Sequence, residues 1–166
     1  YVKSRGGLVL TTAGSSEKLD QCRALGADVA IDYHEDWAEA VKEATQGRGV
    51  DVLLDVMGAK YLEPNVASLA RNGRLVVIGL QGGRKGTLDL NALLTKNALV
   101  TASSLRFSPV PRKGEIVAMV ARDVWPMYES GQIQLPTEKR FDLDDVRSAH
   151  EWLGSGTASG KAVLVV

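Results

Sequence analysis

Residues 8–31 have the sequence LVLTTAGSSEKLDQCRALGADVAI, which contains a strand, a turn of small residues, a helix and a second strand. Residues 8–12 form a compact run of β-favouring residues. Ser15 or Ser16 can cap the helix that follows, and Gly26 can end it. The stretch closes with another short apolar run. A strand, a helix and a strand with such short links favour two parallel strands in one sheet.

The same alternation of strands and helices continues to residue 131. Further strands are predicted at residues 29–31, 50–56, 74–78 and 99–103, and helices at residues 37–45, 61–70, 88–94 and 116–131. The strand at residues 50–56 has few polar residues, as expected for a strand that is buried on both faces. An extended segment, a helix and a last strand follow at residues 135–141, 143–153 and 161–166, without continuing the order cleanly. We predict an α/β fold with a doubly wound parallel sheet.

Composition and charge exclude several classes of protein. The 166 residues are 45% hydrophobic, which is enough for a core, and 20 basic residues balance 20 acidic ones. A net charge of zero predicts no binding to nucleic acid and none to a membrane surface, and no apolar run approaches the roughly 20 residues of a membrane span. Cys22 is the only cysteine and His34 and His150 are the only histidines, so a zinc site is not expected. We expect a soluble, cytoplasmic protein.

Short motifs occur in a characteristic order over nearly the whole chain. They are TTAGSSEK (residues 11–18), LGAD (25–28), IDY (31–33), GRGVDV (47–52), DVMG (55–58), NGRLVVIG (72–79), SSLR (103–106) and SGKAVL (159–164). No single motif is decisive. In this order and spacing they resemble the quinone oxidoreductase family of zinc-free medium-chain reductases, which includes zeta-crystallin.

The resemblance implies a Rossmann-like doubly wound parallel sheet that is incomplete at its first βα unit. Members of the family begin with a substrate domain, followed by a strand, a glycine-rich phosphate turn and a helix, but this chain contains no G-x-G-x-x-G motif. Residues 1–133 would be a partial NAD(P)-binding domain, and residues 134–166 the C-terminal segment of the GroES-like substrate domain. The family's first strand would lie between residues 8–12 and 50–56. Because unpaired strand edges invite other partners, we expect the chain alone to be unstable, strand-swapped or part of something larger.

The end of the first strand predicts the choice of cofactor. NAD-selective sites place an acid there to hold the ribose 2′-hydroxyl, whereas this chain has no acid before Glu17. Small hydroxyl residues with a lysine suit the 2′-phosphate of NADPH, although a helix cap followed by a solvated lysine would have the same pattern. The resemblance puts Tyr33 beside the adenosine, although spacing alone fits an ordinary half-buried tyrosine equally well. His34 is expected to be a surface residue. The cofactor-binding residues predicted at this end are Gly14, Ser15, Ser16, Lys18 and Tyr33.

Three later segments are expected to contact the nicotinamide half of the cofactor through their backbones. Each follows a predicted strand, where open α/β sheets bind ligands. The alternatives are a flexible connection for the glycine-rich loop at residues 79–83 and a surface arginine for Arg106. The residues are Val56, Gly79, Leu80, Gln81, Ser104, Leu105 and Arg106. By resemblance, the strand from Leu99 to Ser103 would also pair across the axis of a homodimer.

The activity that the resemblance implies is hydride transfer from NADPH to a quinone or a related conjugated carbonyl. No acid or base in this chain is compelling as a catalytic residue, so the catalytic residues are unassigned. One alternative is an enoyl reductase that acts on acyl thioesters, and another is a zinc alcohol dehydrogenase. A third is an NADPH-binding protein without catalysis. Trp37, Trp125 and Trp152 are expected in the core.

Overall fold

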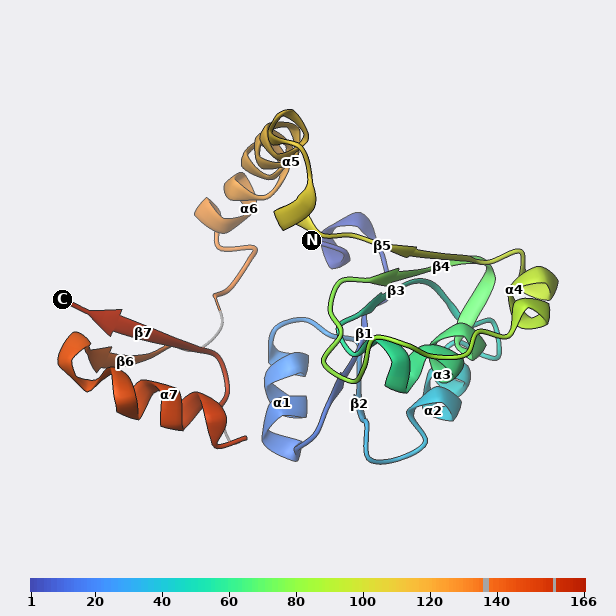
Figure 1. Cartoon of the computed structure of the whole chain (residues 1–166), viewed down its shortest axis with the longest axis horizontal. Coiled ribbons are helices and arrows are strands. Elements are labelled where there is room, and N and C mark those ends of the chain that lie inside the picture. Colours follow the sequence, from blue (N-terminus) through green and yellow to red (C-terminus); the bar gives the residue numbers. More distant parts are fainter. Residues whose placement is uncertain (136–137, 157) are drawn as a thin grey trace. The chain divides into compact units, whose positions relative to one another are not determined.

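The computed structural model describes residues 1–135, 138–156 and 158–166 (Figure 1). Two compact units are present, one of residues 2–118 and one of residues 119–166 together with Tyr1. The larger unit contains η1 (Lys3–Arg5), β1 (Leu10–Ala13), α1 (Ser16–Ala24), β2 (Val29–Asp32), α2 (Trp37–Ala44), β3 (Val50–Asp55), η2 (Gly58–Tyr61), α3 (Leu62–Ala67), β4 (Leu69–Val77), α4 (Leu90–Lys96), β5 (Leu99–Ala102), η3 (Leu105–Phe107) and the start of α5 (Val110–Asp123). The remaining elements are α6 (Trp125–Glu129), β6 (Glu138–Asp142), η4 (Leu143–Asp145), α7 (Val146–Gly154) and β7 (Lys161–Val165).

The strands of the larger unit are parallel, which confirms the predicted α/β class. They form two sheets, β1–β2 and β3–β4–β5. Leu10 pairs with Val29 in the first sheet, and Arg74 pairs with Leu99 in the second. Strands β1 and β3, between which the family resemblance predicts a further strand, thus belong to different sheets.

Strand β3 differs from the prediction that it is buried on both faces. Val52 and Leu54 are 57% and 67% exposed, whereas Leu53 packs against the core. Successive side chains of a strand point to opposite faces, so only the face that carries Leu53 is covered by the described residues. The prediction that the strand is apolar is confirmed, but its second face, which carries Val52 and Leu54, is exposed among the described residues.

The core of the larger unit lies where α3 meets β4, at Val66, Leu69 and Leu75. The predicted helix at residues 61–70 is too long, because α3 ends at Ala67 and Leu69 already belongs to β4. The backbone N–H of Val50 donates to the carbonyl of Ser68 at 2.9 Å, which draws the chain into the sheet at this point. Ser68 and Leu69, which lie beyond the end of the helix, thereby gain Val50 of β3 as a partner.

The ammonium group of Lys96 stabilises the junction between α3 and β4. Its Nζ donates to the carbonyl oxygens of Val66, at 3.2 Å, and of Leu69, at 2.7 Å, and also to that of Ala67. A cation at the carboxyl end of a helix satisfies carbonyl groups that have no partner within the helix. Burial lowers the pKa of Lys96.

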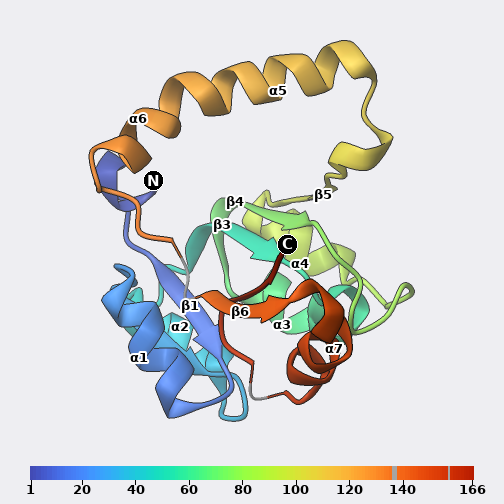
Figure 2. The same ribbon diagram turned by 90° about the vertical axis from the view of Figure 1, so that its left-hand side faces the viewer.

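The long helix predicted at residues 116–131 is two helices, α5 and α6 (Figure 2). The break falls at Val124, directly before Trp125 and Pro126. Proline lacks an N–H and its ring clashes with the preceding turn, so it is tolerated at the start of a helix but not in its interior. Trp125 is 59% exposed, contrary to the expectation that it belongs to the core.

The smaller unit contains a parallel pair, β6 and β7, with α7 between them in sequence. Glu138 pairs with Lys161, and the ring of Phe141 lies 6.0 Å from that of Trp152 on α7. Nζ of Lys139 lies 5.2 Å from the centre of the Phe141 ring. The predicted extended segment at residues 135–141 includes 136–137, which lie outside the described residues. The assignment of residues 134–166 to a substrate domain stays a prediction.

Candidate cofactor site

The turn between β1 and α1 is closed by a tyrosine from the end of β2. Ser15 is the cap of α1, and its Oγ accepts a hydrogen bond from the N–H of Lys18 at 3.4 Å. The N–H of Tyr33 donates to the carbonyl of Ala13 at 3.2 Å, which keeps the two strand ends together. A Cβ atom built on Gly14 would lie 2.5 Å from Cζ of Tyr33, so a side chain at this position would collide with the tyrosine ring. The structure therefore brings together the predicted residues of the turn and Tyr33.

The polar groups of this turn suit an anion. Ser15 and Ser16 are exposed at the start of α1, Lys18 is half-buried in its first turn, and Glu17 is the one acid of that turn. Free N–H groups and the positive end of the helix dipole favour negative charge at a helix start. Hydroxyl and ammonium donors add to this preference.

His34 is exposed, as the sequence predicted, and it also lies beside this turn. Oδ1 of Asp32 accepts the backbone N–H of His34 at 2.9 Å and lies 2.8 Å from its Nδ1. The ring of His34 lies 4.6 Å from that of Tyr33, and its Cε1 would be 3.1 Å from a Cβ on Gly14. The feature of the sequence that could have predicted this contact is the position of His34 directly after Tyr33, at the carboxyl end of β2.

Asp32 is an ionised partner of this histidine. The backbone N–H of His34, followed by its imidazole, lowers the pKa of Asp32 below the usual value of 3.8. Both groups are accessible, with 36% of the Asp32 side chain and 62% of the His34 side chain exposed. Solvent therefore weakens the attraction between the two side chains. The main effect of the Asp32–His34 contact is to orient the imidazole ring.

The second group of predicted residues lies at the carboxyl ends of β3 and β4. The carboxylate of Asp55 is 4% exposed and accepts the N–H groups of Met57 and Gly58, each at 2.8 Å. The carbonyl of Val56 accepts the N–H of Gln81 at 3.1 Å. The loop at residues 79–83 is thus hydrogen-bonded to the turn after β3.

Two glycines allow these loops to touch. A Cβ on Gly79 would lie 2.8 Å from the carbonyl oxygen of Val56. Gly58 has a φ of +75°, and its Cβ would lie 2.7 Å from the carbonyl oxygen of Gly83. Both positions exclude any larger residue for reasons of space, and Gly58 also requires the left-handed backbone conformation. The two glycines therefore let the backbones of the two loops approach each other closely at this end of the sheet.

After β5, Ser104 directly precedes η3, and Leu105 and Arg106 belong to η3. The N–H of Ser103 donates to the carbonyl of Val77 at 3.0 Å, which attaches the start of this segment to β4. The carbonyl of Arg106 accepts Nζ of Lys113 at 3.0 Å. All three predicted residues are exposed. These residues, Val56 and Gly79 follow strands of the sheet β3–β4–β5, whereas Gly14 and Tyr33 follow strands of the sheet β1–β2.

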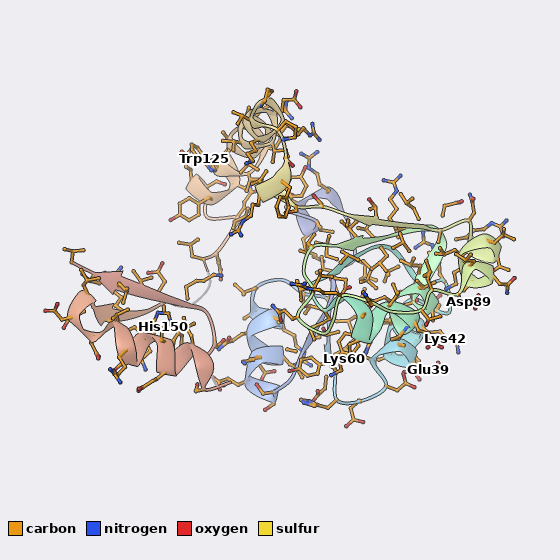
Figure 3. The ribbon with its side chains drawn as sticks, in the orientation of Figure 1. Glu39, Lys42, Lys60, Asp89, Trp125 and His150 are labelled. Carbon is orange, nitrogen blue, oxygen red and sulfur yellow. The ribbon has the colours of Figure 1, made fainter. Side chains whose placement is uncertain are left out.

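A cavity of about 350 Å³ lies elsewhere in the larger unit. It is lined by residues of α2, including Glu39 and Lys42 (Figure 3), and by Gly49 and Leu69, next to the starts of β3 and β4. Nζ of Lys42 lies 3.0 Å from Oε1 of Glu39. Because the predicted cofactor residues follow the ends of strands, this cavity at strand starts does not coincide with the candidate site.

The part of the chain that the structure describes contains no group of three or more histidine, cysteine, aspartate or glutamate residues placed to hold a metal ion. Cys22 and the Asp32–His34 pair do not supply such a set, so we assign no zinc ligands to these residues. Within the same described ranges, no helix is long and apolar enough to cross a membrane.

Parallel strands with small-residue turns and backbone surfaces at their carboxyl ends define a Rossmann-like α/β protein. The chain belongs to the zinc-binding dehydrogenase family, because the sequence model of that family matches residues 1–121. The quinone oxidoreductase of Salmonella typhimurium is 30% identical over 169 residues, which cover 99% of this chain and 51% of that protein. The chain thus spans about half the length of this curated relative, and the match falls in the C-terminal half of the quinone oxidoreductases.

Solved structures show the same relationship. The Escherichia coli quinone oxidoreductase complexed with NADPH has a TM-score of 0.83 and is 28% identical, covering 99% of this chain and 51% of that one. An NAD-dependent alcohol dehydrogenase has a TM-score of 0.77 and is 30% identical, covering 99% and 45%. The predicted resemblance to quinone oxidoreductases is confirmed, and relatives with both kinds of nicotinamide cofactor share the fold.

Proposed function

We propose that this chain is the cofactor-binding part of an NADPH-dependent quinone oxidoreductase. The observation that carries the proposal is the composition of the turn after β1. The ring of Tyr33 lies directly against Gly14 in this turn, and the sequence has no acid before Glu17. The relationship to the quinone oxidoreductases supports it, including the relative whose structure contains NADPH. We expect the protein to act in the cytoplasm, without zinc, on a quinone or a conjugated carbonyl.

The donors around Gly14 fit the 2′-phosphate of NADPH. This group carries negative charge and offers only acceptor oxygens, so hydroxyl and ammonium donors bind it well. Ser15, Ser16 and Lys18 supply such donors from the start of α1, and Tyr33 supplies a hydroxyl from the end of β2. An acid at the end of β1 would instead favour the free hydroxyl of NADH.

The nicotinamide half would lie against the backbone of the second group. NADPH supplies the hydride when bound, and the protein contributes its position and the exclusion of water. Val56, Gly79, Leu80 and Gln81 belong to two loops held by hydrogen bonds, so their exposed backbone groups are already ordered. Ser104, Leu105 and Arg106 would complete this surface from the end of β5.

Calorimetric titration with NADPH and then NADH tests the proposal. Wild-type protein is expected to bind NADPH at least tenfold more tightly, and Lys18→Gln is expected to remove most of that difference, because an ammonium–phosphate bond contributes about 1.5–3 kcal/mol. Lys42→Gln on α2 is the matched control, since Lys42 pairs with Glu39 away from the turn. Equal affinity of the wild-type protein for both cofactors would contradict the proposal. Turnover of a quinone with NADPH tests the reaction itself.

A homodimer through β5 is the second part of the proposal. This strand is an end strand of its sheet, and Leu99 is 52% exposed. Unpaired N–H and carbonyl groups at such an edge can pair with the same strand of a second subunit. Sedimentation analysis of the protein and of a variant with Ala102→Pro would test it. The N–H of Ser103 bonds to β4, so the N–H of the preceding Ala102 points to the free edge, where proline would remove a ladder hydrogen bond. The variant is expected to be monomeric, and an unchanged dimer would argue against this interface.

A further inference from the structure

Asp55 has a buried carboxylate whose two oxygens have separate partners. The residue is 4% exposed, its Oδ1 accepts the N–H of Met57, and its Oδ2 accepts the N–H of Gly58, both at 2.8 Å. The ion pairs formed by the described residues do not include Asp55. Burial of a carboxylate is unfavourable unless hydrogen bonds compensate for the lost water, so these two N–H groups are the partners that stabilise it.

The same two peptide groups are bonded at their other ends to the glycine-rich loop after β4. The carbonyl of Val56 accepts the N–H of Gln81 at 3.1 Å, and the carbonyl of Met57 accepts the N–H of Gly82 at 2.7 Å. Neither peptide bond is cis, and in a planar trans peptide group the C=O and the N–H point in opposite directions. Asp55 therefore holds one end of each peptide group, and the loop is attached to the other end.

This arrangement requires two acceptor oxygens. An asparagine has the same shape but a single acceptor oxygen, and its NH₂ group would face the N–H of Met57 or of Gly58. One peptide group would then lose its partner, and the carbonyl at its other end would no longer be directed at the loop. A change at Asp55 therefore reaches the glycine-rich loop through the backbone, although the Asp55 side chain is itself buried.

We propose that Asp55 is the positioning residue for the nicotinamide half of the cofactor. Its carboxylate orients the two peptide groups between Val56 and Gly58, and these hold the loop that carries Gly79, Leu80 and Gln81. This inference rests on the proposed function, which puts the nicotinamide against these backbones. The carboxylate does not touch the cofactor, and its contribution is a surface that is already in the bound conformation before the cofactor arrives.

The effect of Asp55 is confined to one end of the cofactor. NADPH and NADH have the same nicotinamide half, so a change at Asp55 weakens both by the same factor and leaves the preference between them intact. The residues proposed for the adenosine half, including Gly14 and Ser15, follow a strand of the other sheet. A fragment that contains only the adenosine half therefore binds independently of Asp55. A general loss of structure would instead weaken the fragment and the complete cofactors together.

Calorimetric titration of wild-type protein and Asp55→Asn with NADPH, NADH and adenosine 2′,5′-bisphosphate tests the inference. The variant is expected to bind both dinucleotides about tenfold more weakly, or about 1.4 kcal/mol, and the bisphosphate within twofold of wild type. Asp89→Asn (Figure 3) is the matched control, because the carboxylate of Asp89 also accepts two backbone N–H groups, at the start of α4. It should leave all three affinities within twofold of wild type.

A second variant and a spectroscopic readout make the test independent of one substitution. Asp55→Ser keeps one acceptor without turning an NH₂ group toward the other N–H, and it is expected to weaken both dinucleotides about threefold. The fluorescence of bound NADPH reports the surroundings of the dihydronicotinamide ring. At saturating NADPH, its change on binding should be smaller in both Asp55 variants than in wild type and Asp89→Asn. Circular dichroism and urea denaturation establish the folded fraction of each variant.

The outcomes separate this inference from the proposed function. A wild-type protein that binds neither dinucleotide overturns the proposed function and the role of Asp55 with it. Equal affinity of the wild type for NADPH and NADH overturns only the cofactor preference, since a tenfold loss of both in Asp55→Asn would still support the positioning role. Wild-type affinities in both folded Asp55 variants overturn that role alone. An equal loss of adenosine 2′,5′-bisphosphate binding also overturns it, because that result indicates a general structural effect.

Discussion

Replacing Gly58 by alanine tests whether the two loops at the ends of β3 and β4 are packed as one surface. Gly58 combines a φ of +75° with a contact, since an added Cβ would lie 2.7 Å from the carbonyl oxygen of Gly83. The left-handed conformation costs a residue with a side chain roughly 1–2 kcal/mol. Overpacking against backbone costs about 1–3 kcal/mol more. We therefore expect Gly58→Ala to lower the free energy of unfolding by about 2–5 kcal/mol.

Three other glycines separate the cost of the left-handed conformation from the cost of the close contact. Gly47 has a φ of +78° with no atom within 4 Å of its added Cβ, so Gly47→Ala should cost about 1–2 kcal/mol. Gly79 has the contact without a left-handed φ, at 2.8 Å from the carbonyl oxygen of Val56, so Gly79→Ala should cost about 1–3 kcal/mol. Gly114 lies inside α5 with neither feature, and Gly114→Ala should stabilise the protein by roughly 0.5–1 kcal/mol.

Urea denaturation followed by circular dichroism measures all four variants, and thermal unfolding provides a second readout. At roughly 2–4 °C for each kcal/mol, Gly58→Ala should lower the Tm by roughly 4–20 °C. Its cost should approach the sum of the costs at positions 47 and 79. A Gly58→Ala protein as stable as Gly114→Ala would refute the packing of these loops. A cost equal to that of Gly47→Ala alone would refute the close contact with Gly83.

Three further predictions concern single side chains of the larger unit. Asp55→Ala leaves two backbone N–H groups without their carboxylate and should cost about 2–4 kcal/mol in urea denaturation, whereas a loss under 1 kcal/mol would show that water replaces it. Asn65 is 3% exposed, and its Nδ2 has no hydrogen-bond partner among the described residues. Asn65→Leu should therefore change stability by less than about 1 kcal/mol, and a larger loss would reveal a missing partner. Asp28 has a pKa below the usual 3.8 because Lys3 and then the N–H of Val9 bond its carboxylate, so its stabilising effect is present above pH 3.8 and is lost as the pH falls below it. Acid titration of Asp28→Asn should show a shallower loss in that range, and a curve identical to wild type would contradict the linkage.

Local chemistry in the sequence was enough to predict much of this fold. Ser15 caps α1 because a hydroxyl accepts a backbone N–H that the helix leaves open. The helix at residues 37–44 and the parallel order of the strands also follow from neighbouring residues, through apolar periodicity and short links. The candidate cofactor segments were predicted for the same reason, since each directly follows a strand.

Competition between neighbouring segments decided what the sequence pattern missed. Residues 68–70 are compatible with helix or strand, and the bond from Val50 to Ser68 selects the strand. Apolar spacing predicted one continuous helix at residues 116–131, but Pro126 divides it into α5 and α6. The apolar side chains of β3 indicated burial on both faces, but burial depends on what covers each face. These outcomes depend on partners that are distant in sequence, which periodicity does not detect.

The sequence by itself determined the class of fold, the family and the small-residue turn that ends β1. Their causes are local, because helix caps, turn residues and strand composition act within a few positions. Only the tertiary structure decided that Tyr33 and His34, which follow β2, meet Gly14, which follows β1, since this meeting requires the two strands to pair in one register. The same is true of the loops around Gly58 and Gly79, whose close approach is set by the pairing of β3 with β4.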